Sequence, residues 1–334
     1  MTLAEGAESY LRIYLDPFAR FLDSPDVTDI YVNAPGEVWI ETLGGSIVRH
    51  DAPQVTETHL WRLARQIAAV THQGISREHP LLAATLPAGP RVQIIAPPAT
   101  RGPLAMAIRK HVAAGLSLNC LDAAGAFKCA RASDRRPATR TEMDEFYLAR
   151  NWPAFLSAAV RSRKTIVVSG GTSTGKTTFL NALIGEIDRD ERLVLIEDTP
   201  ELRCTHANSV GLVAARGSGG EAQVDAEDLL VASLRLRPDR IILGEVRGPE
   251  AFTFLRAVNT GHPGSLTTIH ADSSAGVIEQ MALLVLASGG RLSRAEIACT
   301  VTNAVDIFVH LERNDGRRLV TEITWPTRQS QRQS

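Results

Sequence analysis

A short glycine-rich segment, SGGTSTGKTTFLNAL (residues 169–183), limits the folds open to this chain more than any other feature. It matches the pattern G-x-x-x-x-G-K-[ST] at Gly170, Gly175, Lys176 and Thr177. An apolar, strand-like run precedes it and a helix-like run follows it, which is the context that this pattern requires. Glycines allow backbone N–H groups to converge on phosphate oxygens at a helix N-terminus. The segment therefore predicts a nucleotide-binding loop in an α/β domain.

The residues of this loop have separate expected roles. Lys176 is expected to neutralise the β- and γ-phosphates, and the Thr177 hydroxyl is expected to reach Mg²⁺. An accidental glycine-rich turn is the alternative, and it fits poorly because the chain has only four lysines. No N/T-K-x-D motif selects guanine, so the expected cofactors are ATP and Mg²⁺. The predicted nucleotide-binding residues are Gly170, Gly171, Thr172, Ser173, Thr174, Gly175, Lys176, Thr177 and Thr178.

The second half of the chain, residues 146–334, alternates between strand-like and helix-like runs. This alternation predicts an α/β domain with a mostly parallel sheet covered by helices on both faces. The end of the chain, VDIFVHLERNDGRRLVTEITW, predicts a hairpin about an Asn-Asp-Gly turn. The expected strands span 165–169, 192–197, 240–244 and 265–269, and the expected helices span 144–163, 226–236, 250–258 and 275–287.

The first half, residues 1–115, predicts a smaller α+β domain. Residues 57–70 carry apolar side chains at helical spacing, and short strands are expected at 29–34, 37–42, 91–97 and 104–110. Between the halves, the stretch CLDAAGAFKCARASDRRPATRTE loses periodicity and gains charge, Ala and Pro. Residues 116–145 are therefore expected to be a linker.

Acidic residues follow two of the expected strands. Glu197 and Asp198 end one strand, where they are expected to orient water, Mg²⁺ or an attacking hydroxyl, or else to cap a turn. Glu245 ends the next strand and is expected to polarise the attacking water and to reach Mg²⁺ through water. The preceding residue is Gly244, where many phosphate-loop enzymes have an Asp, so Mg²⁺ is expected to be held by Thr177, phosphate oxygens and water.

Two histidines flank the expected strand at 265–269. His262 and His270, with Asp272 nearby, could form a metal site, sense the γ-phosphate, or lie in ordinary turns with Asp272 as a helix N-cap. The sensor reading is favoured for His270, because it stands at the strand end. Arg91 and Arg109 lie on expected strands of the first domain and are candidates for a catalytic role, since phosphoryl transfer often uses an arginine from a neighbouring subunit.

Charge and composition narrow the classes of function. The net charge is −1 and aromatic residues make up 5%, which is unlike the basic, aromatic-lined groove of a nucleic-acid motor. The four cysteines form no C-x-x-C pair, which argues against a zinc ribbon or a redox motif. The N-terminal residues lack the pattern of a signal peptide, and a cytoplasmic location is expected.

Four motifs taken in order resemble the type II/type IV secretion ATPase superfamily. They are GGTSTGKTT, IEDTPEL, LRLRPDRIILGEVRGPEA and TGHPGSLTTIHADS. The resemblance is strong over residues 155–325 and weaker over 25–110. The last two motifs are most similar to the traffic ATPases of type IV secretion and conjugal transfer.

The resemblance implies a RecA-like ATPase domain preceded by a smaller α+β domain, assembled as a hexameric ring. It also implies a place at the cytoplasmic face of the inner membrane, with channel components as partners and secreted protein or protein–DNA as cargo. Direct sequence-specific binding of nucleic acid is not expected. The residues carried over as catalytic are Lys176, Glu197, Glu245, His270, Arg91 and Arg109.

Three alternatives remain open from the sequence. The same motor could serve type IV pilus or type II secretion assembly. The chain could be a RecA-like nucleic-acid motor, or a nucleotide-gated docking platform with slow hydrolysis.

Overall fold

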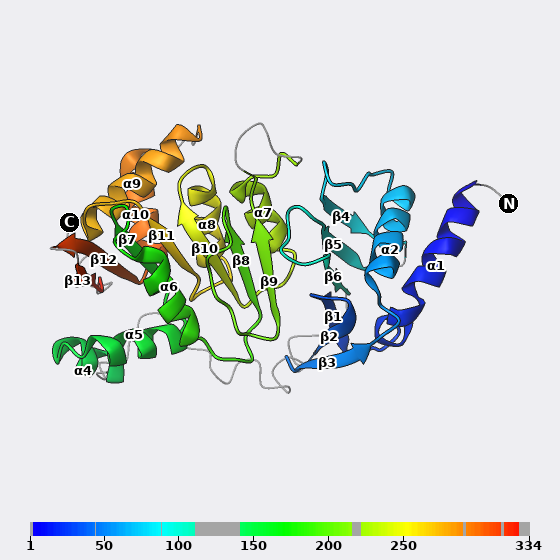
Figure 1. Cartoon of the computed structure of the whole chain (residues 1–334), viewed down its shortest axis with the longest axis horizontal. Helices are drawn as coiled ribbons and strands as arrows, with labels where there is room; N and C mark the ends of the chain where they lie inside the picture. Colours follow the sequence, from blue (N-terminus) through cyan, green and yellow to red (C-terminus); the bar gives the residue numbers. More distant parts are fainter. Residues whose placement is uncertain are drawn as a thin grey trace, which may run out of the picture.

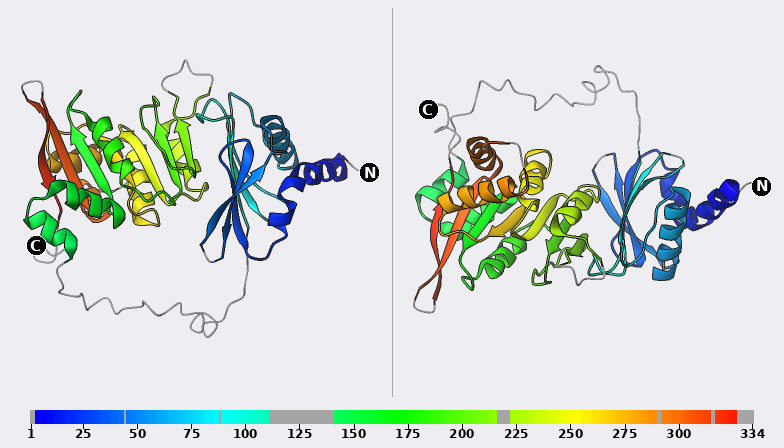
Figure 2. Two further views of the ribbon diagram at one scale, coloured as in Figure 1. Left: turned by 60° about the horizontal axis from the view of Figure 1, so that its bottom comes forward. Right: turned by 90° about the horizontal axis from the view of Figure 1, so that it is seen from above.

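The computed structural model describes residues 3–43, 45–87, 89–110, 141–215, 222–289, 292–314 and 317–326. Two bodies, each built on its own sheet, lie side by side (Figures 1 and 2). Most of the expected linker, 116–145, lies outside the described residues. Helix α4 (Glu142–Leu148) begins within its last part.

The first body is an antiparallel sheet with two helices on one face (Figure 1). In the described residues its strand order is β3-β2-β1-β6-β5-β4. The strands are β1 (Val27–Val32), β2 (Gly36–Thr42), β3 (Ile47–Ala52), β4 (Leu81–Thr85), β5 (Arg91–Ile95) and β6 (Ala105–Arg109). The helices are α1 (Leu3–Leu22) and α2 (Glu57–Val70).

The two faces of this sheet bury different sets of side chains. Ile30, Met106 and Ile108 pack in the core beneath α1 and α2. The alternate positions Tyr31 and Ala107 pack in a core that they share with the second body. Because strand side chains alternate between faces, β1 and β6 each contribute to both cores.

The second body is a mostly parallel sheet with the order β13-β12-β7-β11-β10-β8-β9 in the described residues. Among the described strands of this sheet, only β12 and β13 pair in antiparallel fashion. The strands are β7 (Ile166–Gly170), β8 (Leu193–Glu197), β9 (Ser209–Val213), β10 (Arg240–Val246), β11 (Leu266–Ile269), β12 (Ile307–Asn314) and β13 (Arg317–Thr324). The predicted α/β fold class is confirmed.

Helices cover both faces of this sheet, as the alternation of the sequence predicts (Figure 1). They are α5 (Trp152–Arg161), α6 (Lys176–Gly185), α7 (Ala226–Ser233), α8 (Glu250–Asn259), α9 (Ser274–Ala287) and α10 (Arg294–Ala304). Val168 and Ile242 pack in the core with residues of α5 and α6, whereas Val167 and Ile241 pack in the core with residues of α7 to α10. Among the described helices, none combines the length and apolar character needed to cross a membrane.

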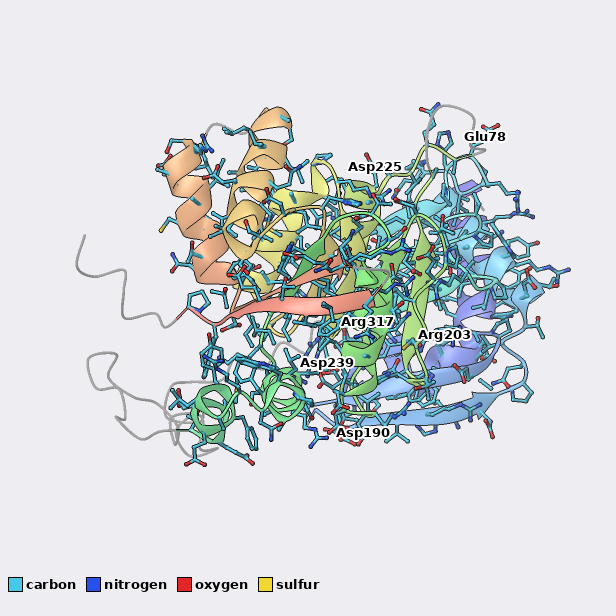
Figure 3. The ribbon with its side chains drawn as sticks, turned by 60° about the vertical axis from the view of Figure 1, so that its left-hand side comes forward. Glu78, Asp190, Arg203, Asp225, Asp239 and Arg317 are labelled. Carbon is cyan, nitrogen blue, oxygen red and sulfur yellow. The ribbon has the colours of Figure 1, made fainter. Side chains whose placement is uncertain are left out.

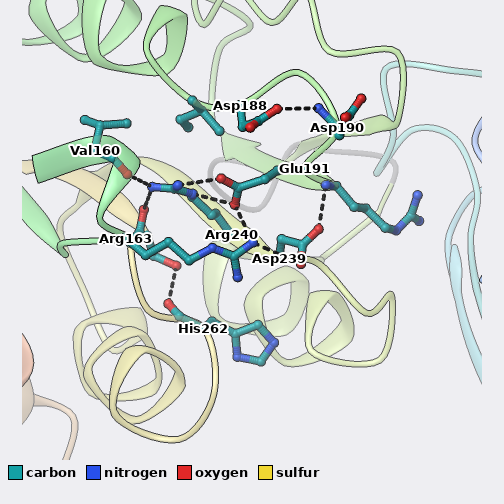
Figure 4. A network of polar contacts seen from close by, with 12 residues as sticks. Val160, Arg163, Asp188, Asp190, Glu191, Asp239, Arg240 and His262 are labelled. Atoms are coloured by element: carbon teal, nitrogen blue, oxygen red, sulfur yellow. Dashed lines mark hydrogen bonds and ion pairs between the residues drawn. The ribbon is translucent and has the colours of Figure 1, made fainter. Parts of the chain in front are cut away.

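A buried ion-pair network fixes the amino ends of the parallel strands (Figure 4). Arg240, which begins β10, is fully buried and donates from Nε and Nη2 to the carboxylate of Glu191 at 2.8 and 2.5 Å. Its Nη1 donates to the carbonyl oxygen of Val160 at 2.7 Å. Arg163 contacts Glu191 at 3.0 Å from the partly exposed side. Each of the three guanidinium nitrogens of Arg240 therefore has an acceptor, as burial of a charge requires.

The structure differs from the sequence prediction in several elements. The single helix expected over 144–163 is two helices, α4 and α5, with a break at Arg150, whose φ is 54°. Strands β3, β4 and β9 and helix α10 were not predicted. The turn of the predicted hairpin, 315–316, lies outside the described residues, but its two strands are present.

Candidate functional site

A cavity of about 550 Å³ opens at the carboxyl end of the parallel sheet. We call it the phosphate-loop cavity. It is lined by Thr172, Ser173, Thr174, Gly175, Lys176, Thr177, Thr178, Glu197, Asp198, Thr199, Glu201, Gly244, Glu245, Arg247, Thr268, His270 and Arg318. Of the predicted loop, residues 172–178 line the cavity, and Gly170 and Gly171 contact Lys176 just behind it.

The loop joins β7 to α6 through a tightly turned backbone. Ser173 and Gly175 both have left-handed backbone angles, with φ of 62° and 93°. Helix α6 then begins at Lys176, so its first N–H groups point toward the cavity. The positive end of the helix dipole and these free donors together favour an anion at this place.

Lys176 is held back against its own loop. Only 8% of the residue is exposed, and Nζ donates to the carbonyl oxygens of Gly170 and Gly171 at 2.9 and 3.0 Å. Nζ also lies 3.7 Å from Glu245 Oε1. Burial lowers the pKa of Lys176, and the charge of Glu245 opposes that shift. A cation held by carbonyl oxygens can exchange them for phosphate oxygens, which bind it more strongly.

Glu245 stands at the centre of the polar side chains in the cavity. Its side chain is 13% exposed, and Oε1 lies 3.0 Å from His270 Nε2. Oε1 is buried and accepts no well-aligned hydrogen bond. Oε2 forms an ion pair with Arg247, which also lies 3.6 Å from Asp198 Oδ2. A buried carboxylate oxygen with free acceptor capacity can take a hydrogen bond from a water molecule.

The structure gives a reason for glycine at position 244. The pairing of β10 with β11 gains one residue between Leu243 and Val246, which is a bulge at Gly244 and Glu245. A Cβ atom built at position 244 would lie 3.1 Å from Glu197 Cγ. Glu197 can therefore pack closely against β10 because residue 244 has no side chain.

Glu197 ends β8 and is 5% exposed. Its Oε1 accepts hydrogen bonds from the backbone N–H groups of Glu201 and Leu202 at 2.9 and 2.7 Å. Its Oε2 forms an ion pair with Arg101 of the first body. Asp198, the other member of the predicted acidic pair, also lines the cavity.

The two histidines lie at opposite ends of β11. His270 follows the strand and lines the cavity, with Nδ1 3.4 Å from Lys176 Nζ. His262 precedes the strand, is half-buried, and lies 3.4 Å from the carbonyl oxygen of Ala257. Burial lowers the pKa of His262. The structure therefore does not bring the two histidines together.

Asp272 does not cap the following helix. The N-cap of α9 is Ser273, whose side chain accepts from Gly276 N, while Asp272 accepts from the Ser273 hydroxyl at 3.1 Å. No group of three or more His, Cys, Asp or Glu side chains within the described ranges could hold a metal ion. The metal-site reading of His262, His270 and Asp272 has no support in these residues.

The predicted arginines lie outside the cavity of their own chain. Arg91 and Arg109 face each other in the β5–β6 register, and both are exposed. Arg109 Nε lies 4.0 Å from Asp29 Oδ1. Neither residue is among those that line the cavity.

Three other arginines among the described residues contact the cavity or its acids, and none of them was predicted from the sequence. Arg247 is two residues from Glu245, a spacing that can place two strand residues on one side. Arg318 lies near the start of β13, whose first residue is labelled in Figure 3, and its Cδ would be 3.0 Å from a Cβ at Gly175. Arg101 contacts Glu197 only because the two bodies pack together, and no sequence pattern signals this contact.

Comparisons with known proteins agree with this arrangement. The model of the type II/IV secretion system protein family matches residues 14–314. The type IV secretion system protein VirB11 of Bartonella henselae is 36% identical over 337 residues, covering 96% of this chain and 94% of its own. The type IV secretion system protein PtlH of Bordetella pertussis is 37% identical over 333 residues, covering 96% of each chain.

A solved structure extends the similarity to three dimensions. It is the VirB11 ATPase of the Brucella suis type IV secretion system in complex with sulphate, which superposes with a TM-score of 0.90 at 34% identity over 96% of each chain. The chain therefore belongs to the type II/IV secretion system protein family, close to VirB11, and is an ATP-hydrolysing enzyme of type IV secretion.

Proposed function

We propose that this ATPase depends on Mg²⁺, hydrolyses ATP in the phosphate-loop cavity, and works as a hexameric ring. The observation that carries the proposal is the convergence of Lys176, Glu245 and His270, whose side chains lie within 3.0 to 3.7 Å of one another at the amino end of α6. A cation, a free carboxylate oxygen and an imidazole at one helix N-terminus suit phosphoryl transfer.

Each of these side chains has a proposed task. Lys176 moves from the loop carbonyl oxygens to the β- and γ-phosphate oxygens of ATP. Glu245 accepts a hydrogen bond through Oε1 from the attacking water and orients it toward the γ-phosphate. His270 contacts the γ-phosphate and reports its presence. Glu197 fixes the wall of the cavity opposite Glu245.

The residues of the cavity fit a Mg²⁺ ion bound together with nucleotide. Thr177 lines the cavity one residue after the lysine, and Glu245 Oε1 is buried with free acceptor capacity. An ion that keeps several waters and phosphate oxygens as ligands needs few protein ligands. Bound there, Mg²⁺ would neutralise charge on the phosphate oxygens. Thr177 would hold it directly and Glu245 through water.

The two predicted arginines are proposed to act on a neighbouring subunit. Arg91 and Arg109 are exposed on the first body and do not line their own cavity. Cationic groups that complete a phosphoryl-transfer site are often supplied by a second subunit. A ring in which each first body faces the next ATPase body would provide this contact.

We also propose that the ring works at the cytoplasmic face of the inner membrane. Its partners there would be components of the secretion channel, and its cargo would be protein or protein–DNA. The relatives that carry this part of the proposal are named for type IV secretion.

Mixing two inactive variants tests the ring. The first variant is Lys176→Ala, and the second is Arg91→Ala combined with Arg109→Ala. If the arginines act across subunits, the mixture recovers part of the wild-type turnover, because some interfaces join an intact loop to intact arginines. Light scattering with Mg²⁺ and a non-hydrolysable ATP analogue should give six times the chain mass of 36.1 kDa. A monomer under these conditions, with no recovery on mixing, would rule out the ring.

A further inference from the structure

The connection between β5 and β6, residues 96–104, seats the first body on the edge of the parallel sheet. The N–H of Val213 donates to the carbonyl oxygen of Ala99 at 3.0 Å, and the N–H of Arg101 donates to that of Gly211 at 2.8 Å. Thr100 forms an antiparallel bridge with Leu212. This connection therefore hydrogen-bonds to the outer edge of β9, which is an edge strand of the second sheet.

The side chain of Arg101 crosses β9 at Gly211. A Cβ atom built at Gly211 would lie 2.5 Å from Arg101 Cδ and 2.9 Å from its Nε. Real Cβ atoms essentially never lie that close to another atom, so a side chain at position 211 would force the flexible arginine to shift. The position of the Arg101 side chain therefore depends on the absence of a side chain at position 211.

The path ends at the acid of the phosphate-loop cavity. Arg101 Nη2 pairs with Glu197 Oε2, and Nη1 donates to the carbonyl oxygen of Leu202 at 3.2 Å. The other oxygen of Glu197 is held by the N–H groups of Glu201 and Leu202. The Glu197 carboxylate is thus clamped between its own loop and an arginine of the other body.

The carboxylate of this ion pair is shielded from water, whereas Arg101 is partly exposed to it. The side chains of Arg101 and Glu197 are 27% and 3% exposed, and burial lowers the pKa of Arg101. Charge pairs away from water interact more strongly than surface pairs, and a guanidinium fixes a carboxylate in direction as well as in charge. The orientation of Glu197 therefore depends on where the first body sits.

We propose that Arg101 is a positioning residue for Glu197. Through Arg101, the position of the first body on β9 sets the orientation of the Glu197 carboxylate in the phosphate-loop cavity. Arg101 acts through Glu197 and does not line the cavity itself. Movement of the first body would shift Arg101 and thereby change the orientation of Glu197 in the phosphate-loop cavity. The inference rests on the proposed function, because it assigns a consequence for turnover.

A double-mutant cycle separates positioning from simple support of the domain interface. Arg101→Ala is expected to lower kcat by about 10-fold, with nucleotide affinity changed by less than about 3-fold. In a Glu197→Gln background the same change is expected to lower kcat by less than about 2-fold, because the group that Arg101 orients has already been altered. Equal losses in both backgrounds, or a rise in kcat, would overturn the proposal.

Amide hydrogen exchange gives a second readout that needs no turnover. The amides of Glu201 and Leu202 donate to Glu197, whereas the amide of Val213 donates to Ala99 where the first body contacts β9. Arg101→Ala should speed exchange at Glu201 and Leu202 and leave Val213 protected. Unchanged exchange at the first two, or faster exchange at all three, contradicts a positioning role.

Two more variants complete the design. Gly211→Ala blocks the path of the arginine without removing its charge, and it should reproduce the exchange pattern of Arg101→Ala. Arg49→Ala removes an exposed arginine of the first body that pairs with Glu37 at 2.8 Å, and it should change neither readout. If Lys176→Ala kept wild-type turnover, the proposed function would be wrong. The exchange pattern of Arg101→Ala does not depend on turnover and tests the role of Arg101 alone.

Discussion

Introducing an Asp at position 244 should lower both the stability and the turnover of this enzyme, although many phosphate-loop enzymes have an Asp there. The Cβ of the new side chain would lie 3.1 Å from Glu197 Cγ and 3.4 Å from the carbonyl oxygen of Ile196. Adding atoms to a packed interior costs about 1–3 kcal/mol. The new carboxylate would also stand beside Glu197 and Glu245, and like charges about 4 Å apart repel by roughly 4 kcal/mol at an effective dielectric constant of 20.

Proton uptake and small shifts would relieve part of this repulsion. We therefore expect Gly244→Asp to lower the free energy of unfolding by about 2–4 kcal/mol and kcat by at least about 10-fold. Gly244→Ala, which adds bulk without charge, should fall between this variant and the wild type.

Urea unfolding and steady-state phosphate release would measure the two effects. Gly185→Ala is a matched control, because a Cβ at that position meets nothing within 4 Å. It should be neutral or stabilising by up to about 1 kcal/mol. Wild-type stability and turnover in Gly244→Asp would refute the argument that the glycine exists to let Glu197 approach.

Two further predictions concern the stability of the ATPase body. Arg240→Ala should lower the free energy of unfolding in urea by about 3–5 kcal/mol, because it leaves Glu191 buried with less compensation; Arg163→Ala, which removes a partly exposed contact to the same acid, should cost less than about 1 kcal/mol. A cost for Arg240→Ala no larger than that for Arg163→Ala would contradict the assigned burial. Because burial lowers the pKa of His262, its neutral form stabilises the fold fully above the unfolded pKa of about 6.5, and this contribution is lost as the pH falls toward the folded pKa. Between pH values of about 7.5 and 5.5, the unfolding free energy of His262→Asn should therefore fall less than that of the wild type, and an equal fall would be evidence against the shift.

Regular, amphipathic segments could be predicted from the sequence with little error. Helix α2 spans Glu57–Val70, the predicted range, because its buried residues recur at helical spacing. Strand β3 was missed because most of its residues are partly or fully exposed, so its pattern carries no apolar alternation. Helix α10 was missed because only three of its residues are buried, and β-branched residues weaken its helical signal.

Some residues of the candidate site could likewise be predicted from the sequence, and others could not. The phosphate loop, Glu197, Glu245 and His270 follow recognisable strand ends, and the topology of a parallel sheet brings such ends to one edge. Arg318 and Arg101 reach this region through a hairpin and through the packing of two bodies. Contacts of this kind depend on tertiary structure, so a single sequence holds no local pattern for them.

Phosphate release from ATP, measured together with nucleotide binding, tests the central claim that this cavity hydrolyses ATP. The wild-type protein should release phosphate only with Mg²⁺. Lys176→Ala should lose most nucleotide binding and turnover, whereas Glu245→Gln should bind nucleotide and release phosphate at least about 100-fold more slowly. Wild-type turnover in either variant would contradict the account, because hydrolysis would then not depend on the lysine and the acid of this cavity.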